Sequence, residues 1–97
     1  MMGKSLEQLR EDIRELDGDV LRLLNERAAR SVEIGQVKRS EGVDVYSSAQ
    51  ESRVFDFLNK QNTGPLNDAA VRDIFREIFS SSRALQGSLT VTYLGPE

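Results

Sequence analysis

The sequence contains no cysteine, no histidine and no tryptophan, and it has two prolines among its 97 residues. Without cysteine the chain can form neither a disulfide framework nor a thiolate metal site. Without histidine it lacks the commonest general base and the commonest metal ligand. We therefore expect no metal site and no disulfide in this chain.

Long apolar runs and a strong excess of one charge are missing as well. No stretch approaches the roughly 20 apolar residues that span a bilayer, and the charged N-terminus has no signal-peptide core. The net charge of −3 argues against nucleic acid as a partner. Hydrophobic residues make up 38% and charged residues 30% of the chain, which excludes a membrane protein and a disordered one. The composition predicts one small cytoplasmic domain.

Apolar residues recur at alternating steps of three and four along the first part of the chain. They are Leu6, Leu9, Ile13, Leu16, Val20, Leu23, Ile34 and Val37. This spacing predicts one helix from about Leu6 to about Arg39. Ser5 and Gln8 have the spacing of a capping box at its start. A glycine inside a helix lowers its stability, so we expect Gly35 to mark close packing.

The length of this helix predicts a dimer. At about 1.5 Å per residue the helix spans roughly 50 Å, whereas a compact domain of this size has a radius of gyration of about 13 Å. The helix must therefore protrude, and a protruding apolar stripe needs a partner. We expect an intertwined homodimer formed through this helix.

Two shorter helices are expected after the long one. Apolar residues indicate a helix from about Ala49 to Gln61. The run Asn62-Thr63-Gly64-Pro65 ends this helix. A third helix, with Asn67 as its cap, is expected to stop at Gly87. The predicted fold is all-α, with three helices per protomer.

The pattern changes after residue 87. Leu89, Val91 and Tyr93 alternate with polar residues, which predicts a strand. One strand cannot form a sheet alone. We therefore assign residues 1–87 to the helical domain, and we expect residues 88–97 to be a linker and the first strand of a further domain.

Polar residues occupy positions where the helical stripes predict apolar ones. Arg27 and Arg30 lie on the stripe of the first helix, and Lys38 lies eleven residues after Arg27, on nearly the same face. In the third helix the stripe continues into Ser82 and Gln86. A charge buried without a partner is costly, so Arg27 and Lys38 are expected to bind an anion.

Each of these residues also has a purely structural interpretation. Arg30 could be a solvated or interface residue, and Ser82 and Gln86 could simply be exposed near a frayed helix end. Arg27 could pair in solvent with Glu26 or Glu33, and Lys38 could complement the dipole at the helix end. Glu51 fits a capping-box pattern at the start of the second helix and could be structural alone.

Arg10 presents a geometric problem. It lies seventeen residues before Arg27, which is about 25 Å along a helix. It cannot easily reach the same small ligand within one protomer. In an antiparallel or crossed dimer, the start of one long helix can approach the middle of the other. Arg10 could then complete the site of the second protomer.

Taken in order and with their spacing, several segments resemble the all-helical chorismate mutases. They are Leu9-Arg10-x-x-Ile13-x-x-Leu16-Asp17, Leu23-Leu24-x-Glu26-Arg27, Glu33-Ile34-Gly35-x-x-Lys38, Glu51 and Phe79-x-x-Ser82-x-x-x-Gln86. The resemblance covers about residues 5–87. The tail Thr92-Tyr93-Leu94-Gly95-Pro96-Glu97 resembles the opening of a prephenate dehydratase domain. The two domains are paired in bifunctional enzymes of phenylalanine biosynthesis.

The resemblance implies an isomerase that converts chorismate to prephenate in phenylalanine and tyrosine biosynthesis. This intramolecular Claisen rearrangement involves no proton transfer, no covalent intermediate and no cofactor. Catalysis requires that chorismate is held in its reactive diaxial shape, and that the negative charge developing on the ether oxygen is stabilised. The lack of histidine and cysteine is then no obstacle.

The resemblance also implies roles for individual residues. Arg27 and, from the other protomer, Arg10 are expected to clamp the carboxylates of chorismate. Lys38 is expected to bind a carboxylate and to face the ether oxygen. Gln86 is expected to donate its amide hydrogen to that same oxygen, which a glutamine can do at any pH.

On the side of the second helix, Glu51 is the fourth expected catalytic residue and would accept from the ring hydroxyl. Ser82 would help to bind a carboxylate. Four positions depart from the family pattern. Gln50 stands where an arginine is usual, and Ser47 where some members place an aspartate near the ring hydroxyl. Ser48 stands where many members have a proline, and Arg30 where a leucine is common. We still count Ser47 among the substrate-binding residues and expect activity.

Two other functions share part of this pattern. The chain could be a non-catalytic helical module that dimerises dehydratase domains. It could also be an isochorismate–pyruvate lyase, a related enzyme whose site shares much of the cation pattern. The dehydratase-like tail favours the mutase.

Overall fold

The computed structural model describes residues 3–42 and 48–94, and side chains within these ranges as far as residue 86. It contains α1 (Leu6–Ser40), α2 (Ser48–Gln61) and α3 (Asp68–Leu94). The described residues contain no strand. The predicted all-α fold with one long helix and two shorter ones is therefore confirmed.

Local hydrogen bonds explain where α1 begins and ends. The Gln8 amide N–H donates to Ser5 Oγ at 3.1 Å, and the Ser5 amide N–H donates to Gln8 Oε1 at 2.8 Å, so the predicted capping box is present. At the other end Gly42 has a positive φ of 73° and donates to the carbonyl of Arg39. Glycine adopts this left-handed conformation without steric cost, which allows the chain to leave the helix here.

The turn between α2 and α3 is held by asparagine side chains. Asn62 donates to the carbonyl of Leu66 at 2.9 Å and to Asp68 Oδ1 at 2.8 Å. The Ala70 amide donates to Asn67 Oδ1 at 2.7 Å, so Asn67 caps α3 as predicted. The bond to Asn67 satisfies a backbone N–H in the first turn of α3 that has no intrahelical partner, and the bonds of Asn62 tie the turn together.

The predicted strand after Gly87 is wrong, because α3 continues as a helix to Leu94. A strand needs a neighbour for its backbone N–H and C=O groups, whereas a helix satisfies them within its own segment. The described residues contain no strand with which this segment could pair. A glycine inside a helix costs only about 1 kcal/mol, so Gly87 does not stop α3. The domain boundary at residue 87 stays a prediction.

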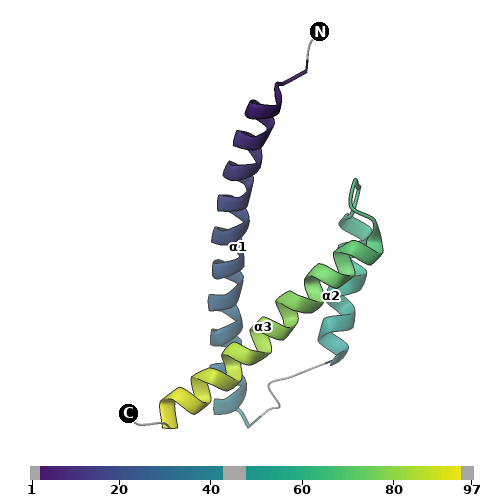
Figure 1. Ribbon diagram of the computed structural model, residues 1–97. Coiled ribbons are helices and arrows are strands. Elements are labelled where there is room, and N and C mark those ends of the chain that lie inside the picture. Colours follow the sequence, from purple (N-terminus) through teal and green to yellow (C-terminus); the bar gives the residue numbers. More distant parts are fainter. Residues whose placement is uncertain (1–2, 43–47, 95–97) are drawn as a thin grey trace.

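The three helices form an open V (Figure 1). The C-terminal part of α1 is crossed by α3, and α2 packs along the first part of α3, away from α1. The N-terminal half of α1 stands apart as the second arm. The radius of gyration is 17.6 Å and the extents are 60 × 34 × 17 Å, far from a compact globule. The predicted protrusion of the long helix is confirmed.

The small core lies where α3 meets the other two helices. Phe79 of α3 is 4% exposed, and its ring packs edge-to-face on Phe55 of α2 at 5.1 Å and on Phe75 at 6.1 Å between centroids. This aromatic cluster holds α2 against α3 on one side of the V.

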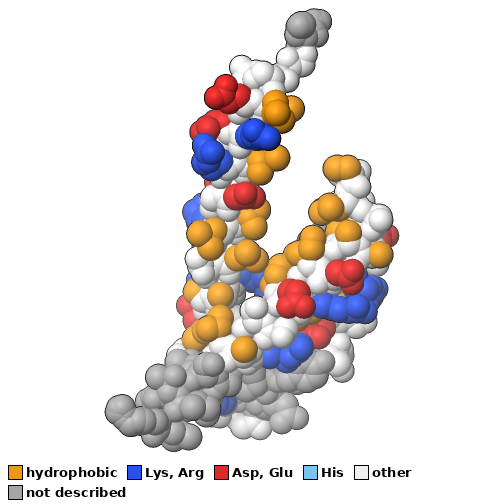
Figure 2. All heavy atoms as spheres, viewed as in Figure 1, with side chains coloured by type: hydrophobic (Ala, Val, Ile, Leu, Met, Phe, Trp, Pro, Cys, Tyr) orange, Lys and Arg blue, Asp and Glu red, His pale blue; other side chains and the backbone are white. Residues whose placement is uncertain are grey.

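Most of the apolar stripe of α1 stays uncovered. Leu9, Ile13, Leu16 and Val20 are each about half exposed, and hydrophobic side chains line both arms of the V (Figure 2). A single chain therefore leaves much of its apolar surface in water. None of the described helices is both long enough and apolar enough to cross a membrane.

Candidate active site

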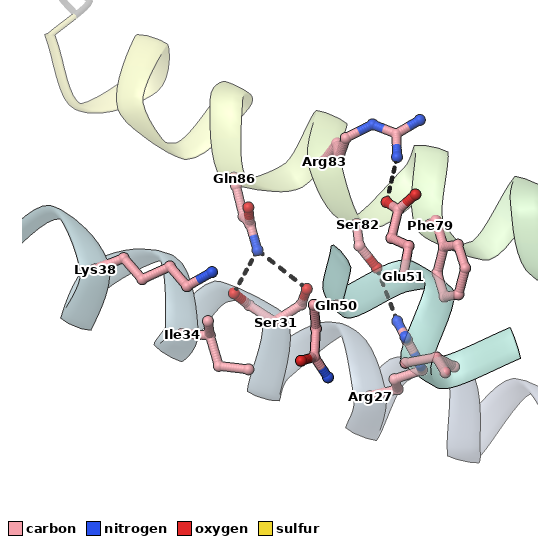
Figure 3. A pocket seen from close by; sticks show the side chains of 11 residues that line it. Arg27, Ser31, Ile34, Lys38, Gln50, Glu51, Phe79, Ser82, Arg83 and Gln86 are labelled. Atoms are coloured by element: carbon pink, nitrogen blue, oxygen red, sulfur yellow. Dashed lines mark hydrogen bonds and ion pairs between the residues drawn. The ribbon is translucent and has the colours of Figure 1, made fainter. Parts of the chain in front are cut away.

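A cavity of about 180 Å³ lies where α1, α2 and α3 come together. It is lined by Arg27, Ser31, Ile34 and Lys38 of α1, by Gln50, Glu51 and Val54 of α2, and by Phe79, Ser82, Arg83 and Gln86 of α3 (Figure 3). All three helices thus contribute polar groups to one small volume.

The α1 wall of the cavity follows from helical periodicity. Arg27, Ser31, Ile34 and Lys38 follow one another at steps of four, three and four, so they share one face of α1. This face continues the apolar stripe of the N-terminal half. The polar residues on the stripe line the cavity, and Arg27 and Lys38 share one face of α1, as their spacing predicted.

Arg27 is held from two sides. Its Nη1 donates to Ser82 Oγ at 3.0 Å, and its guanidinium carbon lies 5.4 Å from the centre of the Phe79 ring. The solvent ion pairs considered for Arg27 are made by other arginines: Arg22 pairs with Glu26 at 3.1 Å and Arg30 with Glu33 at 3.8 Å. A guanidinium has five donor hydrogens, so the bond to Ser82 leaves it able to bind a carboxylate.

Gln86 reaches back from α3 to α1. Its Nε2 donates to the Ser31 carbonyl oxygen at 2.9 Å and to Ser31 Oγ at 3.2 Å. Gly35 is buried beside it, and a Cβ at that position would lie 3.1 Å from Gln86 Cγ. The predicted close packing at Gly35 is confirmed, because the glycine makes room for the glutamine side chain.

Glu51 and Lys38 lie at opposite ends of the cavity. Lys38 is half-buried in the last turn of α1, with its ammonium directed toward the cavity (Figure 3). Glu51 is in the first turn of α2 and accepts from Nη1 of Arg83. Helix α2 begins at Ser48, one residue before the predicted start at Ala49.

The charges of the lining residues favour an anion. Among the described residues, Arg27, Lys38 and Arg83 bring three positive charges, and Glu51 brings one negative charge. Positive charge in a partly enclosed site attracts carboxylates and binds them through charge-assisted hydrogen bonds. The described residues contain no group of three or more aspartates or glutamates that could hold a metal ion.

The structure brings five of the seven predicted site residues to this cavity: Arg27, Lys38, Glu51, Ser82 and Gln86. Arg10 is exposed on the N-terminal part of α1 and does not line it. Ser47 lies outside the described residues.

Other polar and apolar residues line the cavity without having been predicted as site residues. Ser31 and Ile34 lie at helical spacing between Arg27 and Lys38, and that spacing could have identified them. Arg83 gives no such signal, because its place depends on how α2 packs against α3.

A second, larger cavity of about 590 Å³ adjoins the first on the inner side of the V. Its lining is mainly apolar, with Leu24 of α1 and Ile74, Ile78 and Leu85 of α3. Arg27 and Ser82 line both cavities, so their hydrogen bond forms the boundary between them.

Comparison with known families identifies the arrangement. Residues 9–87 match the model of the family described as chorismate mutase type II. The chain belongs to this chorismate mutase family. The matched range includes every described residue that lines the first cavity.

Relatives and solved structures agree with this family. The chain is 37% identical over 100 residues to a bifunctional chorismate mutase/prephenate dehydratase of Neisseria gonorrhoeae, and 33% identical over 98 residues to one of Aquifex aeolicus. These matches cover 99% and 97% of the chain but 27% of each relative. A chorismate mutase structure (form II) from Thermus thermophilus has a TM-score of 0.84 and 31% identity, covering 87% of this chain and 96% of that one.

Membership of the chorismate mutase family fits the chemistry that the cavity offers. The cavity offers cations for carboxylates, an amide donor and a carboxylate acceptor, all on helices. Arg27, Gln86 and Glu51 each have a hydrogen-bond partner that restricts their motion. Such a site can bind and orient an anion and stabilise developing negative charge.

Proposed function

We propose that this chain converts chorismate to prephenate in the first cavity, without a cofactor. The observation that carries the proposal is the convergence of Arg27, Lys38 and Gln86, from two helices, on one cavity that also contains Glu51. Chorismate carries two carboxylates, an ether oxygen and a ring hydroxyl. The cavity offers a complementary group for each of them.

Arg27 and Lys38 bind the carboxylates in this proposal. The hydrogen bond from Arg27 to Ser82 and the contact with the Phe79 ring restrict the guanidinium before substrate arrives. A fixed guanidinium can bind a carboxylate through two parallel hydrogen bonds. Ser82, as the neighbour of Arg27, contributes to the same carboxylate subsite. Holding both carboxylates restricts chorismate to the diaxial shape that the rearrangement requires.

Gln86 and Lys38 stabilise the charge that develops on the ether oxygen. The amide nitrogen of Gln86 carries two hydrogens, and its bond to the Ser31 carbonyl orients that nitrogen toward α1 and the cavity. The Ser31 carbonyl holds one of these hydrogens, and the other, which bonds the Ser31 hydroxyl at 3.2 Å in this structure, donates to the ether oxygen once that longer bond is released. No proton is transferred, so the reaction requires neither histidine nor cysteine.

Glu51 accepts the hydrogen bond of the ring hydroxyl in this proposal. Its side chain is 24% exposed, and it projects from the first turn of α2 toward the cavity (Figure 3). We assign Ser47 to the same side of the substrate from the sequence pattern alone.

A second copy of the chain completes the site. The second cavity and the half-exposed stripe of α1 offer an apolar groove inside the V, next to the Arg27–Ser82 boundary of the first cavity. An α1 helix of another protomer in this groove would cover the stripe. It would also bring its own Arg10 toward Arg27, which Arg10 of the same protomer does not approach. We therefore propose an intertwined homodimer with two equivalent sites, each using Arg10 from the other subunit.

The wider context follows from the relatives. The chain spans 27% of the length of the Neisseria and Aquifex relatives, which are named as fused to prephenate dehydratase. We propose that it acts in the cytoplasm as the mutase part of such a bifunctional enzyme in phenylalanine biosynthesis.

A product assay tests the activity. The purified chain is given chorismate in one reaction and isochorismate in another, and products are separated by chromatography. We expect prephenate from chorismate and no pyruvate from isochorismate. Pyruvate would indicate the lyase, and no product from either compound, in a folded dimeric sample, would indicate a dimerisation module.

A further inference from the structure

Arg83 links two walls of the first cavity. It lies on α3 directly after Ser82, and its guanidinium donates to the carboxylate of Glu51 on α2 (Figure 3). Ion pairs elsewhere, such as Arg22–Glu26 and Arg76–Asp73, lie within one helix. The pair of Arg83 and Glu51 thus differs from them in joining two helices at the edge of a ligand cavity.

Three residues within about one turn of α3 form hydrogen bonds to the other two helices around the cavity. Ser82 accepts from Arg27 of α1, Arg83 donates to Glu51 of α2, and Gln86 donates to Ser31 of α1. Of these three contacts, that of Arg83 alone joins two opposite charges.

The pair is too exposed to be explained by folding stability. The side chain of Arg83 is 44% exposed and that of Glu51 is 24% exposed. Ion pairs with this much solvent contribute little to stability, because water screens the charges and side-chain entropy opposes the fixed geometry. The aromatic cluster around Phe79 already holds α2 on α3.

The ion pair of Arg83 and Glu51 affects the binding of a negatively charged ligand more than it affects folding stability. A carboxylate lining a cavity that receives a dicarboxylate repels it, because like charges at short range in a partly enclosed site interact strongly. Gln50, the neighbour of Glu51 on the cavity wall, is neutral and accepts from Arg53 at 3.2 Å. The guanidinium of Arg83 donates directly to Glu51 and brings a positive charge against its carboxylate.

We propose that Arg83 is a positioning residue of the mutase site. It fixes the Glu51 carboxylate as an acceptor for the ring hydroxyl, and it offsets the charge of that carboxylate so that a dianionic substrate can bind beside it. Arg83 acts through Glu51 and makes no contact with the reacting atoms. This inference rests on the proposed function, since it requires that the cavity binds chorismate.

Steady-state kinetics of Arg83→Gln test the proposal, with Arg76→Gln as the matched control. Arg76 is on the same helix in an exposed ion pair with Asp73, outside the cavity. Arg83→Gln removes the positive charge that offsets the Glu51 carboxylate. We expect KM for chorismate to rise about tenfold, the order of one like-charge contact in a half-exposed site. We expect kcat to change much less, and Arg76→Gln to match the wild type.

The double variant Glu51→Gln/Arg83→Gln distinguishes this role from a structural one. Removing the second charge also removes the repulsion, so its KM should fall back toward the wild-type value. Arg83→Lys keeps the charge and should also have a KM near that of the wild type. A loss of folding would not reverse on a second substitution in the same contact, and circular dichroism of each variant confirms the fold.

Several results would overturn the inference. They are an unchanged KM in Arg83→Gln, a KM in the double variant as high as in Arg83→Gln, and a KM in Arg83→Lys as high as in Arg83→Gln. In each case a wild-type chain that forms prephenate leaves the proposed function standing. A wild-type chain that forms none contradicts the proposed function itself.

Discussion

The polar side chains of the cavity are held in place by protein neighbours before any ligand binds. Arg27 is held by Ser82 and Phe79. Gln86 is held by its hydrogen bonds to Ser31, and its side chain packs against Gly35, where there is no Cβ to displace it. Side chains that are already held in place lose little entropy on binding and need little reorganisation during catalysis, which is how a reaction without covalent or proton-transfer steps can be accelerated.

Replacing Lys38 removes the cation that both binds a carboxylate and faces the ether oxygen in the proposed mechanism. We expect Lys38→Ala to abolish measurable turnover and to leave the fold and the dimer intact, because Lys38 is half-buried and is not part of the aromatic core. Lys60→Ala, which changes an exposed lysine at the end of α2, is the matched control and should be fully active. Turnover in Lys38→Ala close to that of the wild type would remove Lys38 from the mechanism.

Replacing Gln86 removes the neutral donor to the ether oxygen. Losing one donor of this kind typically lowers kcat by about 100- to 1000-fold, and we expect a loss of that order for Gln86→Ala. Gln36→Ala, at an exposed position of α1 outside the cavity, should have wild-type kcat. Stopped-flow or steady-state kinetics at saturating chorismate measure both. A kcat for Gln86→Ala close to that of the wild type would show that the amide does not act on the transition state.

The position of the Gln86 side chain between α1 and α3 depends on the glycine at residue 35. A Cβ at Gly35 would lie 3.1 Å from Gln86 Cγ and 3.4 Å from Arg39 Nη1, both on flexible side chains. Alanine favours the helix over glycine by about 1 kcal/mol. We therefore expect Gly35→Ala to keep the wild-type thermal stability within a few degrees but to lower kcat, because the Gln86 amide is displaced.

The control for this experiment is Gly18→Ala, in the same helix. A Cβ at Gly18 would meet nothing within 4 Å, so this substitution should raise the melting temperature slightly and leave kcat unchanged. Equal kcat values for Gly35→Ala and the wild type would show that the close approach at Gly35 does not position the amide.

The helices could be predicted where their determinants are local. The bounds of α1, its capping box, the Asn67 cap and the break at Asn62 follow from residues within a few positions of one another. The strand expected after Gly87 was wrong because alternating apolar and polar residues describe a single strand and carry no information about the strand it would pair with. Whether such a segment becomes a strand depends on a neighbouring strand, which the described residues do not provide.

The candidate site could be predicted in part. Arg27, Lys38, Ser82 and Gln86 interrupt apolar stripes, and a polar residue on a stripe is visible in the sequence. Arg83 is not visible in this way, because an arginine next to a stripe is usually a surface residue. Its contact with Glu51 depends on the angle at which α2 packs on α3, which periodicity does not determine.

Considered as one unit, a single chain has too little core for its apolar surface. Phe79 is the buried hydrophobic residue of the described chain, while the stripe of α1 and the inner face of α3 remain accessible. Burial of apolar surface is the main stabilising term in folding. The proposed dimer supplies that burial and the missing Arg10 together, so stability and activity are expected to depend on the same interface.

Subunit mixing tests this shared site directly. Arg10→Ala and Arg27→Ala homodimers should each be nearly inactive, because every site lacks one arginine. After exchange of subunits, each heterodimer combines Arg27 of one protomer with Arg10 of the other in one intact site. Heterodimers make up half of a random mixture, so prephenate formation should recover to about a quarter of the wild-type rate. No recovery, in a mixture in which subunit exchange is demonstrated by mass spectrometry, would contradict a catalytic site built from two chains.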